Sequence, residues 1–157
     1  MKLRLTQPTV PQWLFVLGMI GIAVSVFLWY SALSIRVIGC LTGGCELVLS
    51  SPYSRVFGVP IAAYGVAYYA ALLLIAFFRM FDESVIVRMT GWAISLSGIF
   101  FSAYFFYLEI FKINAICSWC KVSTVITVIL FVMALQEIKK YGGITGLREQ
   151  LMSLRVK

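Results

Sequence analysis

Three observations predict an all-α membrane protein, a four-transmembrane-helix bundle. Hydrophobic residues make up 62% of the 157-residue chain and charged residues only 12%, about half the charged fraction of an ordinary soluble domain. Four apolar runs each approach the ~20 residues that a helix needs to cross ~30 Å of hydrocarbon. None of the runs has the polar stripe that every helix of a soluble bundle requires.

The first run, Trp13 to Ile35, carries no charge. Ala32-Leu33-Ser34 loosely resembles a signal-peptide cleavage site, but the run is longer than a usual signal core, which favours a membrane helix. The fourth run contains Lys121, whose side chain is expected to reach towards a headgroup region. The predicted transmembrane helices span residues 13–35, 60–79, 89–109 and 117–137 of a single membrane domain, 1–157.

The connections between the runs differ in length. The longest, Arg36 to Val59, contains two cysteines and a mixed segment, and it is expected to form an outer loop with a short interfacial helix. Residues 138–157 form a basic tail, in which Leu147, Leu151 and Leu154 recur at helical spacing. That spacing predicts a helix on the membrane surface.

Basic residues are distributed unevenly between the two ends of such a bundle. Lipid headgroups, rather than nucleic acid, are the expected partners of the net charge of +7, because the basic residues flank apolar runs. The end with more basic residues is expected to be cytoplasmic. Both termini would then lie in the cytoplasm and all four cysteines at the outer face. The end with more basic residues holds Lys2, Arg4, Arg79, Arg88, Lys139, Lys140, Arg148, Arg155 and Lys157. The other end holds Arg36, Arg55, Lys112 and Lys121.

The chain contains no histidine and only six acidic residues. The missing histidines exclude His-based catalytic triads and His-ligated haem, and they remove most catalytic zinc sites. A carboxylate cage for a metal is also disfavoured. Proton transfer must therefore use thiols, carboxylates, tyrosines or water.

Cys117-Ser118-Trp119-Cys120 is the strongest local motif. Two cysteines separated by two residues in the first turn of a helix can close a disulfide with little strain. The helix N-terminus favours the thiolate, so such pairs are often redox active. Trp119 is typical of a membrane interface. By itself the motif is also compatible with half of a zinc site or with a structural disulfide.

The second cysteine pair, Cys40 and Cys45, encloses Gly43 and Gly44. These glycines give the loop the freedom to close a disulfide or to move. Three interpretations of the four cysteines follow: a thiol–disulfide relay, two static disulfides, or a tetrahedral zinc site. An oxidising outer face favours disulfide chemistry over zinc. A lipid-soluble quinone could then reach the helix bundle from the bilayer and accept electrons from one cysteine pair, while the loop pair meets soluble proteins.

The combination of the Cys40–Cys45 loop pair, Ser51 six positions after Cys45, and a CxxC opening the last helix resembles the vitamin K epoxide reductase family, especially its prokaryotic members. The resemblance covers about residues 13 to 138. It implies a membrane thiol–disulfide oxidoreductase that transfers electrons from a thioredoxin-like protein to a quinone and so supports disulfide formation outside the cytoplasm. It implies no metal.

The resemblance also assigns roles to single residues. Cys117 and Cys120 match the active-site pair, with Cys120 facing the quinone. Cys40 would receive electrons from the thioredoxin-like protein, and Cys45 would pass them to Cys117. Ser51 matches a serine that supports the active site, although Ser before Pro is also a common helix N-cap. The quinone pocket is expected to include Ser51, Phe57 and Thr124.

Two features depart from the family pattern. Many prokaryotic members carry a fused thioredoxin-like domain, for which the 157 residues of this chain leave no room. A separate thioredoxin-like partner is therefore expected. Thr124 stands where the animal enzymes have a tyrosine of the quinone pocket, which leaves the quinone type and epoxide reduction open. The disulfide-bond formation protein B family has similar chemistry but the opposite order of cysteine pairs. A non-enzymatic membrane subunit with structural disulfides is the alternative from another class, and a transporter is a third.

Overall fold

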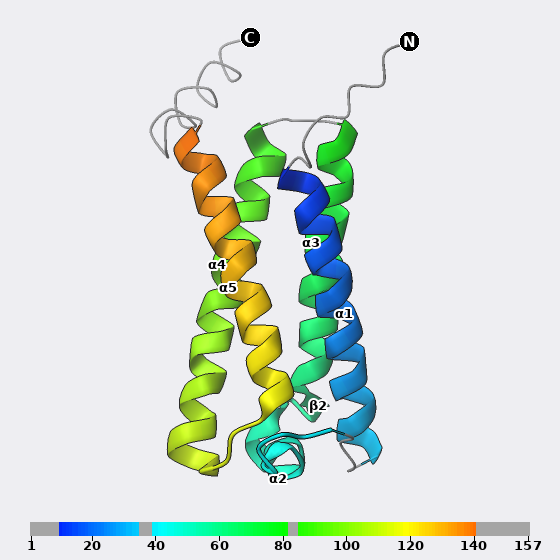
Figure 1. Cartoon of the computed structure of the whole chain (residues 1–157), viewed down its shortest axis with the longest axis vertical. Coiled ribbons are helices and arrows are strands. Elements are labelled where there is room, and N and C mark those ends of the chain that lie inside the picture. The colour runs from blue at the N-terminus through cyan, green and yellow to red at the C-terminus, as the bar shows by residue number, and fades with distance from the viewer. Residues whose placement is uncertain (1–9, 35–38, 82–84, 141–157) are drawn as a thin grey trace.

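The computed structural model describes residues 10–34, 39–81 and 85–140. Most of the basic tail, including the surface helix expected around Leu147, Leu151 and Leu154, lies outside these residues. Four long helices run side by side as a bundle (Figure 1), and each is long and apolar enough to cross a membrane. The prediction of an all-α, four-helix membrane protein is confirmed. The helices are α1 (Val10–Ser34), α3 (Ile61–Phe81), α4 (Val85–Leu108) and α5 (Ser118–Lys140).

The helix ends differ slightly from the sequence-based ranges. α4 begins earlier than residue 89 and continues into a π-helical turn, η2 (Glu109–Ile113), and α5 continues past residue 137 to Lys140. Hydropathy marks the part of a helix that lies in hydrocarbon, whereas capping contacts decide where the helix ends. The chain therefore continues as helix into segments that polar residues had suggested were loops.

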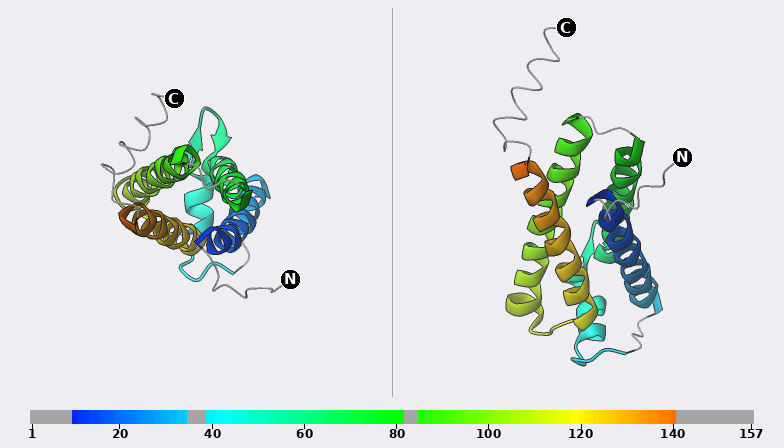
Figure 2. Two further views of the ribbon diagram at one scale, coloured as in Figure 1. Left: turned by 90° about the horizontal axis from the view of Figure 1, so that it is seen from above. Right: turned by 45° about the horizontal axis from the view of Figure 1, so that its top comes forward.

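The connection between α1 and α3 is folded against one end of the bundle. It contains a six-residue helix, α2 (Cys45–Ser50), and a 3₁₀ turn, η1 (Pro52–Ser54). Seen from above, α2 lies beneath the centre of the ring of four helices (Figure 2). Ser51 caps η1, because its hydroxyl accepts a hydrogen bond from the Tyr53 N–H at 3.3 Å. This confirms the N-cap interpretation of Ser51-Pro52.

A minimal hairpin follows η1. β1 (Arg55–Val56) and β2 (Val59–Pro60) pair antiparallel, and the turn between them is Phe57-Gly58. Both turn residues have positive φ, 51° and 80°. That pair of angles is typical of the type I′ turns that match the twist of a two-stranded hairpin. The turn projects Phe57 outward, and its side chain is 97% exposed.

Small residues allow α1 and α3 to approach each other closely. Gly21 faces the ring of Tyr69, and a Cβ at Gly21 would overlap that ring. Gly65 similarly makes room for Ser25. Close approach through small residues is the usual way in which membrane helices gain packing, because lipid supplies no hydrophobic force between them.

Two buried clusters follow from this packing. One fills the half of the bundle away from the loop and is built around Tyr69 and Leu130. The other fills the loop end and includes Cys45 and Cys117 among aliphatic residues of α1 and α2. The two cysteine segments, far apart in sequence, therefore share one apolar core.

We expect Gly21→Ala to lower the thermal stability of the detergent-solubilised protein. The new methyl group would meet the rigid Tyr69 ring, and overpacking of this kind costs roughly 1–3 kcal/mol, which exceeds the ~1 kcal/mol that alanine gains over glycine in a helix.

Gly18→Ala is the matched control on the same helix, because its methyl group would meet only the end of the flexible Leu73 side chain at 2.9 Å. A Gly21→Ala melting temperature at or above that of Gly18→Ala would contradict this account of the α1–α3 contact.

Candidate active site: two cysteine pairs at one end of the bundle

The CxxC motif lies where the chain enters α5. Cys117 is the residue before the first helical residue, and its carbonyl accepts the Lys121 N–H at 3.1 Å. Its sulfur accepts the Cys120 N–H at 3.3 Å. Cys117 thus caps the helix with its own side chain, as Ser or Asp does elsewhere. The prediction that the motif opens the last helix is confirmed.

These contacts change the acidity of Cys117. The hydrogen bond from the Cys120 side chain lowers the pKa of the Cys117 thiol below its usual value, and the backbone N–H groups of Cys120 and Trp119 act in the same direction. Burial and the nearby Glu109 oppose them. A thiol with a lowered pKa is more often the reactive thiolate. The helix start therefore prepares Cys117 for exchange with another sulfur.

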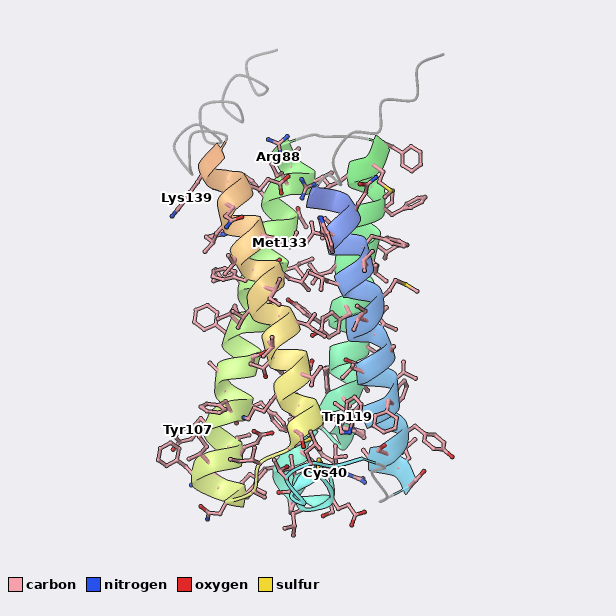
Figure 3. The ribbon with its side chains drawn as sticks, viewed as in Figure 1. Cys40, Arg88, Tyr107, Trp119, Met133 and Lys139 are labelled. Atoms are coloured by element: carbon pink, nitrogen blue, oxygen red, sulfur yellow. A yellow bond between two sulfur atoms is a disulfide. The ribbon has the colours of Figure 1, made fainter. Side chains whose placement is uncertain are left out.

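The loop pair is joined, since Cys40 and Cys45 form a disulfide, whereas Cys117 and Cys120 are free. Ser118 connects the two pairs. Its hydroxyl lies 3.8 Å from the sulfurs of both Cys40 and Cys45, and it accepts the Leu41 N–H at 3.1 Å. Figure 3 shows Cys40 and Trp119 together at this end of the bundle, opposite Arg88 and Lys139.

The loop approaches the chain just before the CxxC motif very closely at Gly44. A Cβ at Gly44 would lie 2.7 Å from the Ile116 carbonyl oxygen and 3.0 Å from the Ile116 nitrogen. The Thr42 hydroxyl donates to the same carbonyl at 2.5 Å. Backbone atoms cannot move aside as a flexible side chain can, so only glycine permits this approach. Gly43 has a different role, because it has φ +68° and open space around it.

A buried carboxylate stands beside the free cysteines. One carboxylate oxygen of Glu109 and the sulfurs of Cys117 and Cys120 all lie within 4.8 Å of one another. Lys121 was expected to reach towards headgroups, but its ammonium pairs with Glu109 and lies 3.8 Å from the centre of the Phe106 ring. A protein carboxylate and an aromatic face are thus partners of Lys121 that the sequence had not indicated, and its approach to a headgroup region stays a prediction.

The same geometry bears on metal binding. Two thiols and one carboxylate could supply three ligands, whereas structural zinc takes four. The Lys121 ammonium occupies one carboxylate oxygen and repels a cation. Cys40 and Cys45 are joined and cannot act as thiolate ligands. The four-thiolate zinc interpretation therefore has no support in this arrangement.

A cavity of about 360 Å³ opens between the four helices next to Cys120. Its volume falls in the range of small-molecule sites. Most of the wall is apolar, with hydroxyl groups from all four long helices and from η1. The Tyr68 hydroxyl is buried in this wall and has no hydrogen-bond partner among the described residues. The hydroxyl-bearing lining residues are Ser25, Ser54, Tyr64, Tyr68, Tyr69, Ser97, Ser102, Ser123, Thr124 and Thr127.

The expected pocket residues lie in three different places. Thr124 lines the cavity and donates its hydroxyl to the Cys120 carbonyl at 3.0 Å. Ser51 is not a lining residue, but its carbonyl accepts hydrogen bonds from the backbone and hydroxyl of Ser54, which is one. Phe57 is also absent from the lining and points outward at the hairpin tip. Phe57 therefore does not line this cavity, and its assignment to a quinone pocket stays a prediction.

Sequence reasoning missed three residues of this region. They are Ser118, Glu109 and Tyr68, none of which the sequence had marked as a candidate site residue. No pattern in the sequence marks Tyr68. The signal for Glu109 was its position: in a chain with only six acidic residues, Glu109 and Lys121 lie on either side of the CxxC motif.

A disulfide-bonded loop pair next to a free CxxC pair, at one end of a bundle of helices long and apolar enough to cross a membrane, is the arrangement expected of a membrane oxidoreductase. The model of the vitamin K epoxide reductase family matches residues 12–135, which is most of the chain. The protein belongs to the vitamin K epoxide reductase family.

We expect Gly44→Ala to separate the loop from the CxxC motif. In a Cys40→Ala background, where Cys45 has lost its loop partner, mild oxidation should form a Cys45–Cys117 cross-link. The added methyl group should reduce its yield severalfold, because it would collide with the Ile116 backbone. Mass spectrometry of digested protein measures the yield.

Gly43→Ala controls for the general effect of removing a loop glycine. It strains the backbone at positive φ, at a cost of roughly 1 kcal/mol, but adds no atom near Ile116. Equal yields from the two variants would show that the close approach at Gly44 does not position the loop.

Proposed function

We propose that this protein passes electrons from a reduced thioredoxin-like protein, through Cys40/Cys45 and then Cys117/Cys120, to a quinone in the cavity. The supporting observation is the division of the CxxC pair. Cys120 lines the cavity, whereas Cys117 is not among the lining residues and packs in the same buried cluster as Cys45. One sulfur can therefore meet a small molecule while the other meets the loop.

The loop cysteines differ in the same useful way. Cys45 is completely buried, and Cys40 is partly exposed. A soluble protein can reach only an accessible sulfur, which favours Cys40 as the contact for a thioredoxin-like partner. Cys45, on the inner side, is then the sulfur that exchanges with Cys117.

The transfer consists of two exchanges and one oxidation. A thiolate of the partner attacks Cys40, and the resulting mixed disulfide resolves to an oxidised partner and a reduced loop. Cys45 attacks the Cys117–Cys120 disulfide at Cys117 and releases Cys120. Cys40 then attacks Cys45, which closes the loop disulfide and frees Cys117. The inner dithiol finally gives two electrons to a quinone, which takes up two protons and becomes a hydroquinone.

The cavity wall suits a flat, mostly apolar acceptor. Apolar surface from α1, α3 and α4 can contact the ring, and the unpaired Tyr68 hydroxyl can donate a hydrogen bond to a quinone oxygen. Thr124 shapes the wall beside Cys120. Ser51 contributes indirectly, because it holds the turn that places Ser54 in the wall.

The alternative of a non-enzymatic subunit with structural disulfides is less well supported. A structural role would favour two closed disulfides, whereas the inner pair is free and its first thiol has a lowered pKa. The adjoining cavity would also have no role in such a protein.

Replacement of single cysteines tests the function. Cys117→Ala or Cys120→Ala should abolish quinone reduction with any donor, measured anaerobically as hydroquinone formation. Cys40→Ala or Cys45→Ala should lose the thioredoxin-like donor but keep activity with a small permeable dithiol, which can reach the inner pair directly. Full activity of Cys120→Ala with either donor would refute the assignment of Cys120.

Orientation is a separate part of the proposal. The starts of α2 and α5, which carry or adjoin three of the cysteines, lie at one end of the bundle, opposite the start of α1 and the end of α5 (Figure 1), and Cys40 lies at the same end (Figure 3). The basic bias predicts that the opposite end is cytoplasmic. A membrane-impermeant maleimide should therefore label reduced loop cysteines of intact cells from outside. Labelling only in inverted vesicles would reverse the orientation and remove the role in extracytoplasmic disulfide formation.

A further inference from the structure

Glu109 has no part in the transfer described so far, yet it lies at the centre of the thiol site. It is 1% exposed, and one of its carboxylate oxygens lies within 4.8 Å of both free sulfurs. Lys121 pairs with Oε2, while Oε1 has no hydrogen-bond partner among the described residues. An unpaired buried carboxylate oxygen costs free energy, so its retention next to reacting atoms calls for a chemical explanation.

The backbone around Glu109 is built to hold it there. Glu109 opens the π-helical turn η2, and its carbonyl accepts the N–H groups of both Asn114 and Ala115. Asn114 ends the turn in the left-handed region, with φ +53°. Single π-helical turns are frequent at functional sites. The segment that leads into Cys117 is therefore anchored to the residue that carries the carboxylate.

Cys117 needs a proton acceptor within the protein. Its side chain is 0% exposed, so solvent does not touch it. It must nevertheless lose a proton whenever the inner disulfide forms, because the thiolate is the nucleophile. Among the described residues, the titratable and charged groups around the inner pair are Cys120 and Lys121 from α5 and Glu109 from η2, and the joined loop cysteines do not titrate.

Charge balance selects Glu109 among these groups. An ionised Cys117 beside an ionised Glu109 would place two buried negative charges against the single ammonium of Lys121, which is unfavourable in a medium of low polarity. Transfer of the thiol proton to the carboxylate produces the thiolate without changing the net charge of the site.

We propose that Glu109 accepts the proton of the Cys117 thiol as that sulfur attacks Cys120, and returns it when exchange with the loop frees Cys117 again. The proposal rests on the function proposed above.

Two electrons leave the inner pair as the Cys117–Cys120 bond forms, and the quinone becomes a hydroquinone. The Cys117 proton stays on Glu109, and the hydroquinone takes one proton from Cys120 and one from water. In the exchange that follows, the loop dithiol loses two protons: one goes to Cys120 and the other to the water that had given one up. Glu109 returns its proton to Cys117.

Glu109→Gln tests this inference, because the amide keeps the shape of the side chain but cannot accept a proton. We expect oxidation of the inner dithiol to be roughly a hundredfold slower at about pH 7, the lower end of general-base effects. The ratio of wild-type to variant rates should fall as the pH rises, since hydroxide can replace the missing base. A merely structural role would give a ratio independent of pH.

Glu137→Gln is the matched control, because Glu137 forms the other described ion pair, with Arg79, at the far end of the bundle. It should leave the rate and its pH dependence unchanged. Glu109→Asp, which retains a carboxylate, should fall between wild type and Glu109→Gln in rate and should keep the wild-type pH dependence. An aspartate variant with a steep hydroxide dependence would overturn the proposal even if Glu109→Gln failed to fold.

Two oxidants separate this inference from the proposed function. Single-turnover oxidation of the inner pair should be followed with a soluble quinone and with 4,4′-dithiodipyridine, a neutral disulfide that reports released thiopyridone. A pH-dependent defect of Glu109→Gln with the disulfide, in a protein that reduces no quinone, would support Glu109 and refute the quinone. A wild-type rate of Glu109→Gln with both oxidants would refute the role of Glu109.

Discussion

The exclusion of water from the hydrocarbon core constrains every other feature of this protein. Each backbone N–H and C=O group at membrane depth must find its partner within the chain, and uninterrupted helices achieve this. Irregular backbone must therefore collect at the ends. Here the glycine-containing loop, the hairpin and the 114–117 segment collect at a single end. The thiol relay that we propose needs movable segments, so its location at this end would follow from the same constraint.

The two described ion pairs lie at opposite ends of the bundle and differ in what surrounds them. Arg79 and Glu137 join α3 to α5, and Glu109 and Lys121 join η2 to α5. Burial of such pairs yields little net stability, because desolvation offsets the attraction. The pair near the cysteines differs in two respects: Glu109 has one oxygen without a hydrogen-bond partner among the described residues, and its carboxylate lies beside two free sulfurs. This position is the basis of the chemical role that we propose for Glu109.

The start of α5 separates the tasks of two otherwise similar thiols. Cys117 lies outside the helix and caps it, so its sulfur is held among backbone donors and against the loop. Cys120 lies within the first turn and borders the cavity. Since three residues correspond to nearly one helical turn, the two sulfurs remain close enough to join. Specific placement thus arises from ordinary helix geometry.

The sequence by itself determined the membrane class, the four helices and the position of CxxC at a helix start, because length, apolarity and capping are local properties. Tertiary structure alone decided the rest. Glu109 meets the inner cysteines, Ser118 meets the loop cysteines and Gly44 meets the Ile116 backbone only after distant segments fold together. Phe57 lies exposed at the tip of a hairpin, away from the cavity. Hydropathy describes single segments and cannot predict such contacts, because they depend on which faces of different helices meet.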